Sequence, residues 1–138
     1  MTTTRETRVL PVAEEDEDAP SLGTLLLASA GNPRDQAAVR ALVDEERILT
    51  RDRIRTALVV KKPDGRMGCD WERFGKRLYI LGLDEGERAF LDLVLSIAGP
   101  HQTSLARVLE LDDRRLAIVL RATVQLSGCD TLAIGTRT

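Results

Sequence analysis

The side chains able to do nucleophilic or metal chemistry are few in this chain of 138 residues. They are one histidine, His101, and two cysteines, Cys69 and Cys129. A zinc site is usually marked by closely spaced ligands such as Cys-x-x-Cys or His-x-x-x-His, and these three residues form no such pair. His101 follows Gly99-Pro100 in an expected turn, where a histidine usually lies at the surface or caps a helix. The sequence therefore predicts no metal site and no cofactor.

The motifs of common enzyme classes are absent as well. The sequence has no glycine-rich phosphate loop, no Gly-x-Ser-x-Gly and no His-Glu-x-x-His. Asp84 and Glu87 have the spacing of an Asp-x-x-Glu capping box at a helix start, and Asp92 is expected to be solvated. We therefore expect a protein that is not an enzyme.

The composition indicates where such a protein works. The first ten residues contain no apolar stretch of the kind found in secretory signals, and no apolar run approaches the roughly 20 residues that span a bilayer. Frequent Arg, Ala and Leu are typical of proteins from GC-rich bacterial genomes. We therefore expect a bacterial, cytoplasmic protein whose Cys69 and Cys129 stay reduced.

The formal net charge of −2 conceals a basic segment, residues 47–77. This segment holds ten Lys and Arg residues against four Asp and Glu residues, whereas residues 1–20 carry a charge of −4. Basic side chains bind the phosphates of nucleic acids without reading much sequence. The alternative is a solvated face that pairs with the acidic tail or with the acids expected on the solvated face of the preceding helix, Asp44, Glu45 and Glu46. The basic segment supplies six candidate nucleic-acid-binding residues: Arg51, Arg53, Arg55, Lys61, Lys62 and Arg66.

A second candidate site lies in residues 102–127, whose apolar spacing is similar to the generic bacterial helix-turn-helix. Leu111-Asp112 would form the turn, and Glu110 stands where such motifs often have Gly. The residues expected to face the interior are Leu105, Ala106, Leu109, Leu116 and Leu120.

The resemblance implies that the second helix of this segment enters the major groove of DNA. Its outward face would also include Ile118, and the neighbouring Asp112-Asp113 pair would repel phosphate. The alternative is two packed helices joined by a tight turn. Arg is suited to reading guanine and Gln to reading adenine, so the segment adds three candidates: Arg114, Arg121 and Gln125.

The elements that must hold these residues are predicted to be mainly α-helical. Aromatic residues make up only 3% of the chain, so the core must be aliphatic, which suits helix packing. The stretch 113–127 is apolar around most of its circumference, with Asp112 as its N-cap and Gly128 just after its end. We therefore expect a compact bundle of six or seven short helices around a central buried helix, 113–127.

Two regions are expected to differ from this helical pattern. A small β-hairpin is predicted near 57–68, because Pro63-Asp64-Gly65 is a turn signal between two extended stretches. The alternative is that the preceding helix continues into this region. Residues 1–20 are polar and acidic and are predicted to form a disordered tail, which leaves 21–138 as a single helical domain.

These observations favour a small non-enzymatic regulatory protein that binds duplex DNA through the helix-turn-helix-like segment and the basic 47–77 face, as in transcription regulation. A helix followed by a basic hairpin is also the arrangement of winged-helix DNA binders. The acidic tail would then compete with DNA for the basic face. The alternative is a helical protein–protein interaction adaptor that binds no nucleic acid, or a homodimer that forms through the apolar first helix around Leu25.

Overall fold

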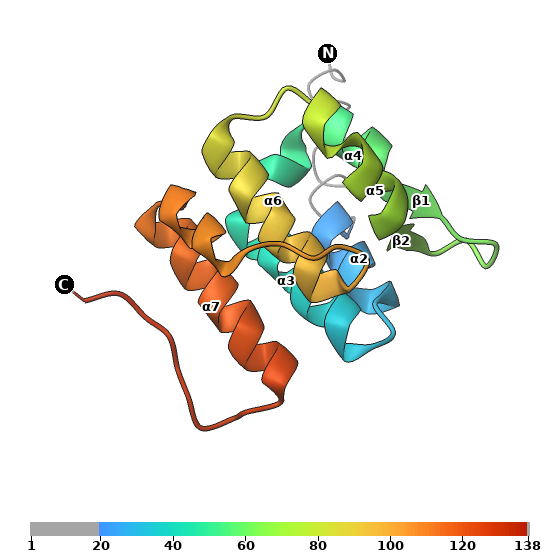
Figure 1. The fold of residues 1–138 in the computed structure, drawn as a ribbon. Helices are drawn as coiled ribbons and strands as arrows, with labels where there is room; N and C mark the ends of the chain where they lie inside the picture. Colours follow the sequence, from blue (N-terminus) through green and yellow to red (C-terminus); the bar gives the residue numbers. More distant parts are fainter. Residues whose placement is uncertain (1–19, 138) are drawn as a thin grey trace, which may run out of the picture.

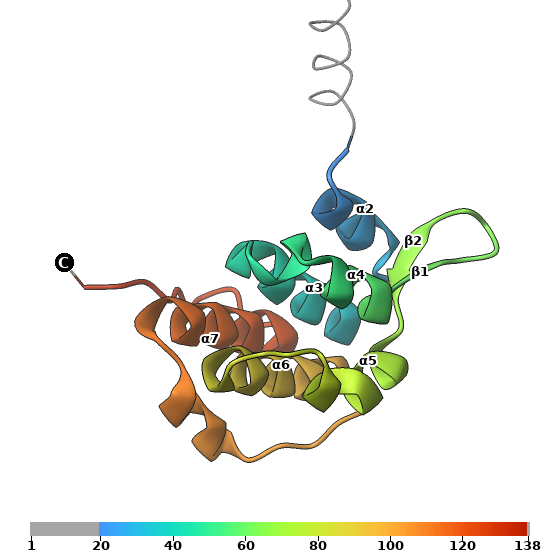
Figure 2. The same cartoon turned by 90° about the horizontal axis from the view of Figure 1, so that it is seen from above.

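The computed structural model describes residues 20–137 and is mainly helical with one small antiparallel hairpin, which confirms the predicted fold class (Figures 1 and 2). The predicted acidic tail falls on residues 1–19, outside the described residues, and on Pro20. In chain order the elements are α2 (Leu22–Ser29), α3 (Pro33–Glu45), η1 (Ile48–Thr50), α4 (Asp52–Leu58), β1 (Val59–Lys61), β2 (Met67–Cys69), α5 (Trp71–Arg77), η2 (Leu78–Ile80), α6 (Glu85–Ala98), η3 (Leu105–Glu110) and α7 (Asp113–Ser127).

Helix α7 has the predicted bounds and the predicted ends. The Asp112 side chain accepts a hydrogen bond from the Arg115 backbone N–H, which caps the first turn. Gly128 closes the helix in the left-handed conformation, with φ of 78°. The local cap signals were therefore sufficient to place this helix in the sequence.

The centre of the bundle is α6, however, and the prediction that α7 is the central buried helix was wrong. Nine of the fourteen residues of α6 are buried, against four of the fifteen residues of α7. Both views place α6 between α7 on one side and α5 on the other (Figures 1 and 2). From Ala89 to Ile97 almost every residue of α6 is apolar, so α6 can be covered on all sides, whereas Leu120 of α7 stays exposed.

The predicted hairpin is present, slightly shorter than the expected 57–68. Residues Ala57 and Leu58 complete α4, and the strands pair in the register Val59↔Cys69, Val60↔Gly68 and Lys61↔Met67. Gly65 occupies the turn with φ of 88°, a value that favours glycine. The helical stretch thus ends at Leu58, and the Pro-Asp-Gly turn between the strands returns the chain toward α5.

A buried carboxylate joins α3 to α7. The side chain of Glu45 is fully buried, and its Oε1 accepts hydrogen bonds of 2.8 Å from the backbone N–H groups of Arg47 and Ile48. Its Oε2 accepts from Nε and Nη2 of Arg115 on α7, at 3.2 and 3.1 Å. Glu45 was expected on a solvated face, and this expectation was wrong because its partner lies 70 positions away in the sequence.

We predict that Glu45→Ala lowers the free energy of unfolding by about 3 to 5 kcal/mol, because it leaves the mostly buried Arg115 guanidinium and two backbone N–H groups without their acceptor. The measurement is chemical denaturation followed by circular dichroism. Glu46→Ala is the matched control, since this neighbouring carboxylate is exposed, and it should change the value by no more than about 0.5 kcal/mol. Equal effects of the two substitutions would contradict the anchoring role of Glu45.

Candidate nucleic-acid interface

The basic segment 47–77 stays together in space. It forms η1, α4, the hairpin and α5, and α4 packs against both α5 and β1 on the side of the molecule opposite α7 (Figure 1). Half of its ten cationic side chains make no hydrogen bond or ion pair with any other described residue, and all of these are exposed: Arg47, Arg53, Lys61, Lys76 and Arg77. We name the four that lie on α4, β1 and α5 the basic side: Arg53, Lys61, Lys76 and Arg77.

The predicted site residues at the start of α4 are engaged inside the protein, with one exception. Arg51 pairs with both oxygens of Glu87, a buried carboxylate that also takes part in the capping box of α6. Arg55 donates to the carbonyl of Thr50 at 2.8 Å and forms an ion pair with Asp52. Only Arg53 among these three predicted arginines is left for a ligand.

The hairpin cations divide in a similar way. Lys62 donates to the carbonyl of Ser29 at 3.3 Å, and Arg66 donates to the carbonyl of Ala28 at 3.0 Å. Both therefore fasten the hairpin to the C-terminal end of α2, where carbonyl groups lack helical partners. Lys61 has no such partner among the described residues and remains exposed on β1.

The helix-turn-helix-like segment does not pack as predicted. Its first helix is the 3-10 helix η3, in which Leu105 and Leu109 were expected to face inward but are 79% and 81% exposed. Conversely Ile118, expected on the outward face of α7, is buried. The reason is that η3 docks on α6 through the ion pairs of Arg107 with Asp92 and Glu85, while α7 turns Ile118 toward the core.

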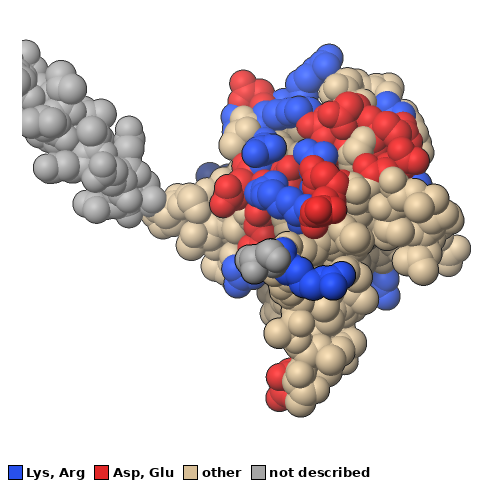
Figure 3. All heavy atoms as spheres, turned by 90° about the vertical axis from the view of Figure 1, so that its left-hand side faces the viewer, with Lys and Arg blue, Asp and Glu red and all other residues tan. Residues whose placement is uncertain are grey.

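The two arginines predicted as site residues on α7 also have partners within the protein. Arg114 donates to the carbonyl of Asp44 at 3.0 Å, and Arg121 donates to the carbonyl of Ile134 at 3.1 Å. Gln125 is exposed. Figure 3 looks onto the side of η3 and α7, where basic side chains lie next to acidic ones and one group of acidic side chains stands together at the upper right. This side is therefore less suited to phosphate than the basic side.

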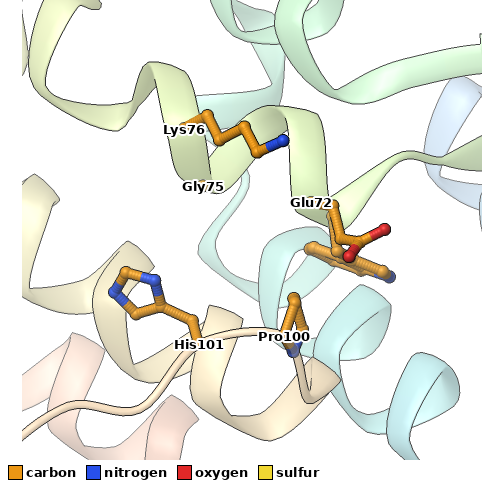
Figure 4. Close-up of a pocket in the computed structure, with 6 residues that line it drawn as sticks. Glu72, Gly75, Lys76, Pro100 and His101 are labelled. Carbon is orange, nitrogen blue, oxygen red and sulfur yellow. The ribbon is translucent and has the colours of Figure 1, made fainter.

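The single histidine lies beside a shallow pocket of about 200 Å³ (Figure 4). Its Nε2 is 3.1 Å from Oδ1 of Asp92, whose Oδ2 accepts from Nε of Arg107 at 3.1 Å. Asp92 was expected to be solvated but is buried, and the sequence offered no local signal for this because both partners lie beyond the end of α6. The pocket is lined by Trp71, Glu72, Gly75, Lys76, Pro100 and His101.

No activated nucleophile accompanies this histidine among the described residues. Cys69 lines an adjoining pocket, and burial, assisted by the negative charge of Asp35, raises the pKa of its thiol to about 12. A thiol of this pKa is almost entirely protonated at neutral pH and reacts slowly. The contact between His101 and Asp92 holds the loop after Gly99 against α6, a structural role.

We predict that the two cysteines differ strongly in reactivity. At pH 8 about one in ten thousand Cys69 side chains is a thiolate, four pH units below its pKa, whereas a hydrogen bond with Thr131 lowers the pKa of Cys129. A chromogenic disulfide reagent should therefore modify one thiol quickly in the native protein and the second only in denaturant. Cys129→Ser should remove the fast phase and Cys69→Ser should preserve it; the opposite pattern would contradict the assignment.

Comparisons and the remaining described features do not narrow the function further. Within residues 20–137 no three His, Cys, Asp or Glu side chains gather as a metal ion would require. Over the same residues, no helix combines the length and the apolar character needed to cross a membrane. No protein-family profile, curated protein or solved structure matches this chain. What the protein binds can therefore be inferred only from the chemistry of its own side chains.

Proposed function

We propose that this protein binds nucleic acid through the basic side, by contacts with backbone phosphates. The observation that carries the proposal is that four exposed cations without a partner among the described residues lie on α4, β1 and α5, and that α4 packs against both other elements. Exposed Lys and Arg release the counterions condensed on nucleic acid when they bind phosphates, and this release supplies affinity that depends steeply on salt. Such contacts position a protein on a duplex but read little sequence.

The hairpin contributes to this surface as a wing would. Lys61 is exposed on β1, and the hairpin is held in place because Lys62 and Arg66 bind the carbonyls at the end of α2. Helix α4 leads directly into the hairpin, so Arg53 and Lys61 belong to consecutive elements. The proposed ligand surface thus keeps the basic 47–77 face expected from the sequence and leaves out α7, which was expected to enter the major groove.

We predict that the double substitution Lys61→Glu with Lys76→Glu weakens binding to random duplex DNA at low salt. It should also reduce the slope of log K against log salt concentration by about 2, one unit for each lost phosphate contact. The measurement is fluorescence anisotropy of labelled duplex at several salt concentrations. Arg40→Glu with Arg137→Glu is the matched control, because both residues are exposed, lie outside segment 47–77 and give the same change in net charge.

Two outcomes would count against this proposal. If both double variants weaken binding equally, only the overall charge matters and the basic side has no special role. If the unaltered protein does not bind duplex DNA at micromolar concentration and low salt, the proposed function fails.

A chain that starts at Ser21 tests whether the acidic tail competes with DNA for the basic side. This shorter chain should bind duplex DNA more tightly at low salt, and unchanged affinity would exclude the competition.

The second candidate function is a protein–protein interaction adaptor. Leu105 and Leu109 are spaced by four residues on η3, and each exposes more than three quarters of its surface. Leu120 of α7 is also exposed. Exposed leucines of this kind favour contact with another protein, because their burial removes apolar surface from water.

For the adaptor, we predict that Leu105→Asp with Leu109→Asp abolishes any self-association without changing duplex affinity. Sedimentation velocity over a range of protein concentrations measures the first effect, and the anisotropy titration measures the second. Gln125→Asp with Thr136→Asp serves as the control, since these exposed polar positions gain the same charge. If the sedimentation coefficient of the unaltered protein keeps the value of a monomer at all concentrations, the homodimer is ruled out.

A further inference from the structure

The arginines of this protein are mostly used as internal hydrogen-bond donors. Arg34 donates to the carbonyls of Ser96 and Ile97 at the end of α6, and Arg73 donates to the carbonyl of Ala57 at the end of α4. In the part of the chain that the structure describes, a minority of the guanidinium groups form no hydrogen bond or ion pair: those of Arg40, Arg47, Arg53, Arg77 and Arg137.

Two of these unpartnered arginines, Arg53 and Arg77, line one pocket. They come from different helices, α4 and α5, and the pocket between them has a volume of about 330 Å³. Small-molecule sites begin at about 300 Å³, so the pocket has room for a small ligand or for one unit of a polymer. Thr56 and Asp52 complete its polar lining, and its apolar lining is Ala57, Ile80 and Leu81.

The electrostatics of this pocket favour an anion. Arg53 and Arg77 are like charges that share one cavity, and the carboxylate of Asp52 on its rim is already paired with Arg55. Two guanidinium groups can each donate paired N–H bonds to the oxygens of one phosphate, a geometry that lysine cannot reproduce. An anion between them would relieve their repulsion and satisfy their donors together.

The Arg53 side chain lies close to the backbone at Gly82, next to the pocket. A Cβ atom at Gly82 would lie 3.0 Å from Nη1 of Arg53, and Gly82 has a φ of 72° that favours glycine. The guanidinium of Arg53 therefore lies against the chain between η2 and α6, next to the pocket wall formed by Leu81.

The apolar lining of the pocket favours an anion that carries an apolar group. Ile80 is 72% exposed, although its neighbours Leu78 and Leu81 are buried, so a large apolar side chain stands open beside two cations. An inorganic anion would leave Ile80 in water. A phosphate ester with a sugar or base attached would engage the two arginines and cover Ile80 at the same time.

We propose that the pocket between Arg53 and Arg77 binds the phosphate group of a nucleoside phosphate, with Ile80 against its sugar or base. The same chemistry is offered by a free nucleotide and by a nucleotide unit within a nucleic acid. If the ligand is a nucleotide unit within a nucleic acid, the proposal rests on the proposed function, because the pocket then binds one phosphate of that nucleic acid. If the ligand is a free nucleotide, the proposal is independent of the proposed function.

The test is isothermal titration of the full chain with adenosine monophosphate, adenosine, inorganic phosphate and a short single-stranded oligonucleotide. A phosphate ester should bind, adenosine should not, and inorganic phosphate should bind more weakly than the ester. Arg53→Gln and Arg77→Gln should each weaken ester binding by about tenfold or more, the loss expected for a charge-assisted hydrogen bond. Arg40→Gln is the matched control, and circular dichroism checks that every variant is folded.

Two further variants separate geometry from charge. Arg53→Lys with Arg77→Lys keeps both charges but removes the paired donors, so its affinity should fall between those of the original and the glutamine variants. Ile80→Ser should weaken the ester and leave inorganic phosphate unchanged. If Arg53→Gln and Arg77→Gln weaken binding no more than Arg40→Gln does, or if neither the ester nor the oligonucleotide binds at millimolar concentration, the proposal is overturned.

The outcomes also distinguish this site from the proposed function. Binding of oligonucleotide that is lost in the Lys61→Glu, Lys76→Glu variant but kept in both glutamine variants assigns the phosphate contacts to the two lysines of the basic side. It overturns the pocket as a site for a nucleotide unit within a nucleic acid. Binding of adenosine monophosphate that depends on Arg53 and Arg77, in a protein that binds no duplex, supports the pocket for the free nucleotide and overturns the proposed function.

Discussion

The buried carboxylate of Glu45 determines how the two halves of the bundle meet. A charge without contact with water is tolerated only when its oxygens are fully hydrogen-bonded. The four donors to Glu45 come from Arg47 just before η1, from Ile48 in η1 and from Arg115 in α7. Because two of them belong to the planar guanidinium of Arg115, the rotation of α7 about its axis is fixed relative to α3. Ile118 then points into the core, and α7 has no face of the kind that the helix-turn-helix comparison required.

Arginine side chains hold the ends of the short helices by donating to their carbonyl groups. With 3% aromatic residues, the chain has few large side chains to cover the ends of its short helices. Arg34, Arg55, Arg66 and Arg73 instead reach carbonyl groups at the ends of neighbouring elements. This explains why a count of positive charge along the sequence overstates the charge available to a ligand, and why the unpartnered cations are the informative ones.

The features predictable from sequence are those set by neighbours in the chain. The caps at Asp112 and Gly128, the Asp84–Glu87 capping box and the Pro-Asp-Gly turn each depend on residues within four positions, and all are present. The features that could not be predicted depend on distant partners. Asp92 is buried because Arg107 and His101 return to it, and Arg77 joins Arg53 only because α5 folds back on α4.

Because the hairpin is attached to α2, ligand binding at the hairpin would also affect the end of this helix. The N–H groups of Lys62 and Arg66 that bind the carbonyls of Ser29 and Ala28 cannot bind phosphate oxygens at the same time. A ligand that recruits these hydrogens removes the donors that close the last turn of α2, and by reciprocity a firmly closed α2 weakens that ligand to the same degree. Fraying of the last turn of α2 and binding of such a ligand at the hairpin are therefore thermodynamically coupled: each makes the other more favourable.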